Sequence, residues 1–75
     1  MADSREVFRY SKAGRLRRYD VKGLPASAAE VWVTSEGRAQ ERKSRKLMTV
    51  ADSTDLQPVL ESIEQELRAG GWSRV

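Results

Sequence analysis

Residues 53–72, STDLQPVLESIEQELRAGGW, carry the clearest helical pattern of the sequence. Their large apolar residues recur in steps of three and four and so form one face of a helix: Leu56, Val59, Leu60, Ile63 and Leu67. The spacing predicts a helix over residues 54–70. A helix with a single apolar face must bury that face against another element, so the rest of the chain has to supply a complementary surface.

Both ends of this predicted helix carry capping signals. Thr54, with a glutamine three residues later, matches a capping box, and Asp55 is an alternative N-cap. At the other end, Gly71 suits the left-handed residue of a Schellman motif, which would bring Trp72 into contact with Leu67.

The chain before the helix favours β-strands. Four segments are rich in β-branched and aromatic residues, at 5–11, 15–22, 30–35 and 46–51. A glycine-containing turn joins the first two. A two-residue loop would pair Phe8 with Tyr19, whereas a three-residue loop would pair Tyr10 with Leu16, and the sequence leaves both registers open. Pro25 excludes a central strand, so its segment is expected to be a loop or a single helical turn.

The order of these elements predicts an α+β fold. We expect an antiparallel sheet of about four strands, arranged as two hairpins, with one C-terminal amphipathic helix packed on one face. The whole chain, 1–75, is long enough for a single domain. Within it, we expect the sheet over 5–50, a disordered N-terminus over 1–4 and a frayed C-terminus over 73–75.

The composition argues against an enzyme. The chain has neither histidine nor cysteine, which removes the imidazole base, the thiol nucleophile and the ordinary zinc ligands. It has no glycine-rich phosphate loop and no dinucleotide fingerprint. Asp20, Glu30 and Glu36 fall at no spacing that forces two carboxylates together. We therefore expect no catalytic residues, no cofactor and no metal, and an enzyme acting through carboxylates alone is only a third hypothesis.

The expected location is the cytoplasm. A small secreted domain would usually carry disulfides, and this chain has no cysteine. Its first residues are charged and precede no apolar stretch, so they do not resemble a signal peptide. The longest run of large apolar residues, 31–33, is far shorter than the ~20 residues that span a bilayer. The sequence predicts a small soluble bacterial-type protein without membrane contact.

Charge is distributed unevenly along the chain. Residues 1–50 contain twelve Lys or Arg and six Asp or Glu, a net charge of +6, whereas residues 51–75 carry −3. If the helix covers one sheet face, the two charge sets lie on opposite sides, as expected for a protein that meets an anionic partner. The candidate nucleic-acid-binding residues are Arg9, Arg15, Arg17, Arg18, Arg38, Arg42, Lys43, Arg45 and Lys46.

Each candidate also has a structural interpretation. The cluster at 38–46 is equally typical of a solvated hairpin, and cations on an exposed strand discourage aggregation. Tyr10 and Trp32 are possible stacking or interface residues, but the aromatic residues of the first hairpin also suit a core under the helix. Trp32 must face away from Val31 and Val33. Either the two valines pack the core and Trp32 is exposed, or the reverse holds.

These patterns leave two main functional hypotheses. The first is a non-enzymatic protein that binds nucleic acid, with single strands favoured, through a basic sheet face and the basic hairpin. The alternative is a protein-interaction or assembly module, either a homodimer or an adaptor for an acidic protein. A sheet with one covered face and few core residues also favours a homodimer.

Four strands followed by a helix, with a basic hairpin beside the stretch VWVTSEGR at 31–38, resemble a known binding fold. It is the single-stranded-DNA-binding fold of the transcriptional coactivator called positive cofactor four. The resemblance covers the order of elements over residues 8–68 and includes no diagnostic motif. It implies a dimer whose curved basic sheets hold a single strand.

Overall fold

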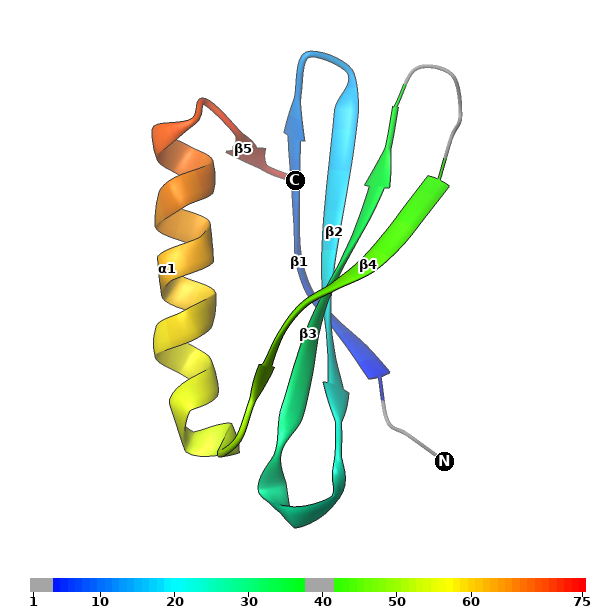
Figure 1. The fold of residues 1–75 in the computed structure, drawn as a ribbon. Coiled ribbons are helices and arrows are strands. Elements are labelled where there is room, and N and C mark those ends of the chain that lie inside the picture. Colours follow the sequence, from blue (N-terminus) through cyan, green and yellow to red (C-terminus); the bar gives the residue numbers. More distant parts are fainter. Residues whose placement is uncertain (1–3, 38–41) are drawn as a thin grey trace.

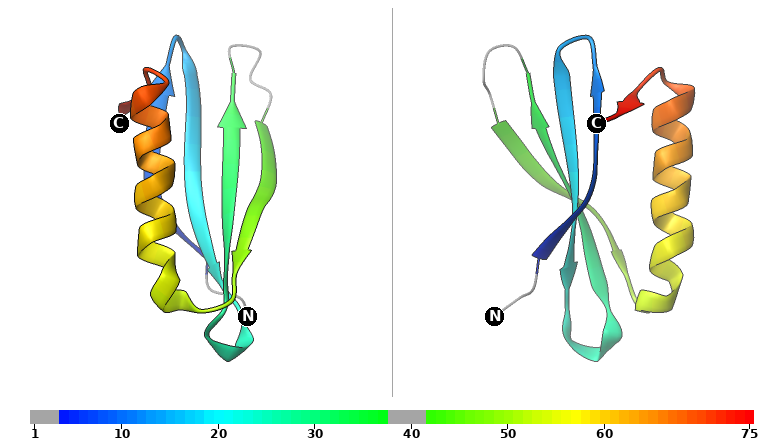
Figure 2. Two further views of the ribbon diagram at one scale, coloured as in Figure 1. Left: turned by 60° about the vertical axis from the view of Figure 1, so that its left-hand side comes forward. Right: turned by 180° about the vertical axis from the view of Figure 1, so that it is seen from behind.

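The computed structural model describes residues 4–37 and 42–75 and has two layers (Figures 1 and 2). One layer is an antiparallel sheet in the order β4-β3-β2-β1-β5, and helix α1 (Leu56–Ala69) packs on one of its faces. The strands are β1 (Ser4–Lys12), β2 (Arg15–Gly23), β3 (Ala29–Glu36), β4 (Arg42–Val50) and β5 (Ser73–Arg74). The predicted fold class is confirmed, with one strand more than the expected four.

The first hairpin adopts the register of the two-residue loop. Ala13 and Gly14 both have positive φ, 51° and 80°, which gives the turn the twist that suits a tight hairpin. Phe8 consequently pairs with Tyr19. This register places their two rings on the same face of the sheet, 5.0 Å apart between centroids.

The core lies between α1 and the sheet face that α1 covers, here called the helix side; the other face is the open side. One cluster of buried residues comprises Phe8, Tyr10, Tyr19, Val33 and Leu67, and a second comprises Val21, Ala29, Val31, Val50 and Leu56. The predicted apolar face of the helix is confirmed. Leu56 and Leu67 are buried, and Val59, Leu60 and Ile63 are half-buried against the clusters.

The predicted capping box at Thr54 was wrong, whereas Asp55 does occupy the N-cap position of α1, although its side chain makes no capping hydrogen bond. The chain first makes a 3₁₀ turn, η2 (Ser53–Asp55), and Asp52 caps that turn by accepting a hydrogen bond from the backbone N–H of Thr54 at 3.0 Å. This hydrogen bond favours the charged carboxylate and lowers the pKa of Asp52 from its ordinary value. The start signal therefore lies one turn earlier than the helical periodicity indicates.

The predicted Schellman motif at the end of α1 is confirmed. Gly71 has φ 86°, its N–H donates to the carbonyl of Arg68 at 3.1 Å, and the N–H of Trp72 donates to the carbonyl of Leu67 at 2.9 Å. Trp72 packs against the first core cluster, which contains Leu67.

The chain after this turn forms a strand, so the expectation of a frayed C-terminus over 73–75 was wrong. The Schellman turn directs the chain back along β1, where Ser73 and Arg74 pair with Ser11 and Tyr10. The N–H of Val75 also donates to the carbonyl of Arg9 at 3.0 Å.

Two other predicted segments can be compared with the structure. Ser4, expected in a disordered N-terminus, begins β1 and pairs with Lys22, while the rest of 1–4 lies outside the described residues. The proline segment forms a single 3₁₀ turn, η1 (Pro25–Ser27), as expected. Among the residues that the structure describes, no helix has the length and apolar character to cross a membrane.

Candidate nucleic-acid interface

Strand register determines which side of the sheet each predicted cation occupies. Residues directly opposite each other on antiparallel strands share a face, and successive residues alternate between faces. Tyr10, Arg17, Ser35 and Lys43 form one row across the sheet on the helix side. By the same pairing, four predicted cations lie on the open side, Arg9, Arg18, Arg42 and Lys46, and four lie on the helix side, Arg15, Arg17, Lys43 and Arg45. Arg38 lies outside the described residues.

Every predicted cation of the open side has a carboxylate partner. The pairs are Arg9 with Glu6, Arg18 with Asp20 at 3.2 Å, Arg42 with Glu36 at 3.4 Å and Lys46 with Glu30 at 3.5 Å. Hydrogen bonding to Glu6 raises the pKa of Arg9 above its ordinary value. The open side is therefore a mixed and largely compensated charged surface.

Trp32 lies in the middle of this open side. Val31 and Val33 are buried in the core, which settles the alternatives in favour of the valines facing the helix. The half-buried Trp32 donates a hydrogen bond from its Nε1 to Oε1 of Glu30 at 3.2 Å. This bond, assisted by Lys46, lowers the pKa of Glu30. Tyr10, the other predicted stacking residue, is fully buried in the core, so its ring is closed to a ligand.

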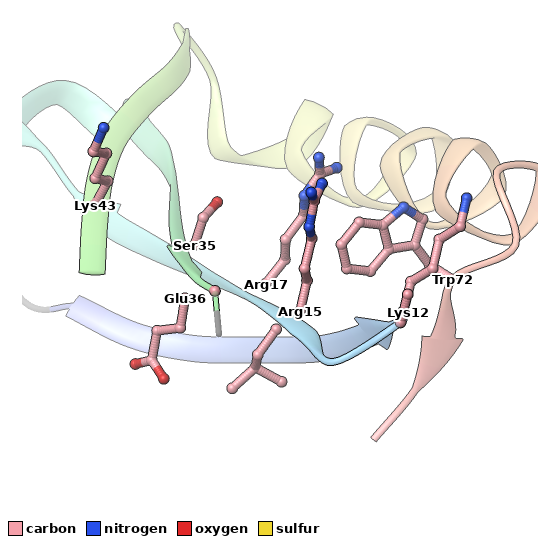
Figure 3. A pocket seen from close by; sticks show the side chains of 10 residues that line it. Lys12, Arg15, Arg17, Ser35, Glu36, Lys43 and Trp72 are labelled. Atoms are coloured by element: carbon pink, nitrogen blue, oxygen red, sulfur yellow. The ribbon is translucent and has the colours of Figure 1, made fainter. Parts of the chain in front are cut away.

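Cations of the helix side gather around a cavity of about 860 Å³, here called the basic groove. It lies beside the β1–β2 turn, and Lys12, Arg15, Arg17, Lys43 and Trp72 are among the residues that line it. Figure 3 shows Arg15 and Arg17 extending towards the side of β2 that carries the Trp72 indole, whereas Glu36 points to the opposite side.

Two contacts connect residues of the basic groove with the chain at the end of α1. The guanidinium carbon of Arg17 lies 4.3 Å from the centroid of the Trp72 ring, a cation–π arrangement. The ammonium group of Lys12 donates a hydrogen bond to the carbonyl of Gly70, where a cation also interacts favourably with the helix dipole. The first hairpin and the helix terminus are thereby linked.

In the described chain, three of the four predicted cations on the helix side lack the ion pairs that are present on the open side. Within residues 4–37 and 42–75, no ion pair involves Arg15, Arg17 or Arg45. Glu36 contributes to the groove lining, but its carboxylate pairs with Arg42 of the open side. The predicted cations without an ion pair in the described residues therefore all lie on the helix side.

Lys12 and Trp72 belong to this groove although the sequence did not single them out as site residues. Lys12 could have been found from the hairpin register, because a two-residue turn pairs it with Arg15 on the same face. Trp72 could be assigned to a contact with Leu67 but not to the groove, since that position depends on where the helix crosses the sheet.

A second cavity, of about 440 Å³, adjoins the basic groove and shares Arg17, Ser35 and Trp72 with it. Among the described residues, no group of three or more acidic side chains could hold a metal ion. Comparison of the chain with protein-family models, curated proteins and solved structures finds no match.

Proposed function

We propose that the protein binds nucleic acid, without catalysing a reaction, through the basic groove. The observation that carries this proposal is the difference in compensation between the two sides of the sheet. Arg15, Arg17 and Arg45 have no carboxylate partner in the described chain, so a phosphate would not have to displace one.

The arrangement of the groove supports a chain of phosphates rather than one small anion. Its cations come from β1, β2 and β4, so they spread across the sheet instead of converging on one point. The adjacent Trp72 also provides an aromatic surface, and aromatic residues beside cations are typical of sites for single-stranded nucleic acid. We place this binding in the cytoplasm, which suits a chain without cysteine.

Two triple variants of equal charge test the proposal. The first replaces three helix-side cations, Arg15, Lys43 and Arg45, with Gln; the second replaces three open-side cations, Arg9, Arg42 and Lys46. Both lose three positive charges, so long-range attraction falls equally and any difference reports local contact. We expect the helix-side variant to lose most of its affinity for a labelled single-stranded 12-mer at low salt, and the open-side variant to keep most of it.

The salt dependence of binding provides a count of contacts. Four or five phosphates engaged on a single strand would give a slope of about −3 in log K against log salt, and the helix-side variant should flatten it by about 2. Equal losses of affinity in both variants would contradict a preference of the nucleic acid for the helix side. No binding by the unmodified protein at tens of micromolar would reject the proposed function.

A second candidate function is an interaction module for an acidic protein segment. It is favoured by β4, an edge strand whose residues 42–46 are all exposed, which could pair with an added strand. Antiparallel pairing of two copies of β4 would instead place Arg and Lys close to one another, which opposes a homodimer through this edge. Direct binding of labelled poly-glutamate by the unmodified protein, lost in the helix-side variant, would indicate that the groove accepts polyanions in general.

A further inference from the structure

The second cavity is a recess between α1 and strands β2, β3 and β4, and apolar and polar side chains line it in similar measure. Its lining includes Tyr19, Val33 and Leu67, which are buried members of the first core cluster, and Ile63 and Leu47, which are half-buried. At about 440 Å³ it falls in the range of pockets that hold small organic groups. Helix α1 therefore does not completely cover the apolar side chains on this part of the helix side.

A β-bulge in β4 shapes this recess. The pairing of β3 with β4 shifts between Val31 and Trp32, so that Met48 lies opposite Val31, Lys46 lies opposite Trp32, and Leu47 is the extra residue. Successive residues normally alternate between faces, but the bulge allows both Leu47 and Met48 to line the recess. Met48, at 39% exposure, is one of two exposed large apolar side chains among the described residues, the other being Val75.

Charge around the recess is arranged differently from charge in the groove. Arg17 and Arg45 stand among its lining residues, but so does the carboxylate-bearing Glu66 of α1. Arg17 and Arg45 favour phosphates, whereas Glu66 opposes a phosphate next to α1 and is compatible with an uncharged aromatic group. An anionic chain would therefore keep its phosphates over the basic groove and beside Arg45, and place an uncharged part of itself against the apolar side chains of the recess.

We propose that this recess holds one unstacked base of a single strand whose phosphates lie along the basic groove. This inference rests on the proposed function and adds its substrate class: single strands are preferred to duplexes, because a paired and stacked base cannot enter the recess without being extruded. Arg17, Ser35 and Trp72 line both cavities, so base and backbone would meet at these shared residues.

The first test compares two probes on the unmodified protein. One is a labelled deoxythymidine 12-mer and the other is an abasic 12-mer with the same phosphate backbone. Contact with one base is worth ~1–3 kcal/mol, so we expect the abasic probe to bind roughly 5- to 150-fold more weakly. Equal affinities would overturn the inference and leave the proposed function intact, whereas failure of both probes to bind would reject both.

The second test locates the base. Met48→Trp fills the recess without changing charge, and Thr49→Trp is the matched control, because Thr49 pairs with Glu30 and so lies on the open side. We expect Met48→Trp to bind the thymidine and abasic probes equally, with its abasic affinity unchanged, and the control to keep the full preference. A preference that Met48→Trp retains or increases would place the base elsewhere and overturn the inference. Thermal unfolding of both variants verifies that they are folded, and the probe comparison on the unmodified protein does not depend on them.

Discussion

The two sides of the sheet carry equal numbers of the predicted cations, yet they differ in how many of these cations have a carboxylate partner. On the open side, each of the four cations pairs with a carboxylate, from its own strand for Arg9 and Arg18 and from β3 for Arg42 and Lys46. On the helix side, Arg15, Arg17 and Arg45 have no such partner in the described chain. The number of cations in a strand is therefore a poor guide to binding, because the carboxylates near them on the same face decide how much of their charge stays uncompensated.

The comparison is sharpest at two adjacent residues of β4. Arg45 lies opposite Val33 on the helix side, and Lys46 lies opposite Trp32 on the open side, 3.5 Å from a carboxylate oxygen of Glu30. They belong to the same basic cluster in the sequence, but strand alternation separates them. We expect the two sides to differ in packing as well as in charge.

The largest expected effect is on stability and comes from the helix side. Leu67, at 4% exposure, joins α1 to the first core cluster, so Leu67→Ala should lower the free energy of unfolding by ~2–5 kcal/mol through the cavity it leaves. Leu16 is half-buried on the open side, so Leu16→Ala should lower the free energy of unfolding by less than ~1 kcal/mol. Urea unfolding of both variants measures the difference. Similar losses would show that the open side carries as much of the packing.

A smaller loss is expected at the turn that positions Trp72. Gly71→Ala forces an L-residue to adopt φ 86°, which should cost ~1–2 kcal/mol of stability and shift Trp72 in the groove. Gly70→Ala is the matched control, since Gly70 has φ −83° and an added Cβ would approach neighbouring atoms no closer than 3.4 Å. Thermal unfolding with tryptophan emission measures both variants. A larger loss of stability from Gly70→Ala than from Gly71→Ala would contradict this account of the turn.

The adjacent cations of β4 should differ in affinity rather than in stability. Arg45→Gln should weaken binding of a single-stranded 12-mer several-fold and flatten the salt slope by about 0.7, the contribution of one phosphate contact. Lys46→Gln should leave both quantities nearly unchanged, because its charge is already compensated by Glu30. Fluorescence anisotropy titrations at several salt concentrations compare them. The reverse ranking would move the interface to the open side.

The smallest effect concerns pH and the open side alone. The folded protein lowers the pKa of Glu30 below the ordinary 4.5, mainly through the hydrogen bond from Trp32. A lowered folded-state pKa gives stability that is present above the ordinary value and lost as the pH falls through the folded-state value. Trp32→Phe removes the donor, so the pKa of Glu30 should rise towards 4.5 in a carboxyl titration by NMR. Trp72→Phe, on the helix side, should leave it unchanged.

The sequence predicted the parts of the fold that depend on local spacing. The apolar residues of α1, its Schellman turn and the strands before it all follow from periodicity and from glycine at position 71. Asp52 was missed as a cap because η2 inserts a turn before the regular helix. The two-residue hairpin was one of two registers that the sequence allowed, and the contacts of Phe8 and Tyr19 with the helix layer select it.

The candidate site was less predictable, because its residues come together through non-local contacts. Eight of the nine predicted cations can be placed, and they divide between the two sides according to register and bulges. Two of the ion pairs depend on a neighbouring strand, because Arg42 and Lys46 of β4 pair with Glu36 and Glu30 of β3. The position of Trp72 over Arg17 joins the last turn of the helix to the second strand, which no local pattern indicates.

The pairing of β1 with β5 brings the beginning of the sheet next to its last strand. This contact closes a long loop, so its entropic cost must be met before its few hydrogen bonds form. We infer that β5 docks late in folding and opens by local fluctuation while the central strands stay paired. Amide hydrogen exchange should therefore be fast at Val75, whose N–H bonds to Arg9, and slow at Val31 and Tyr19 in the interior of the sheet.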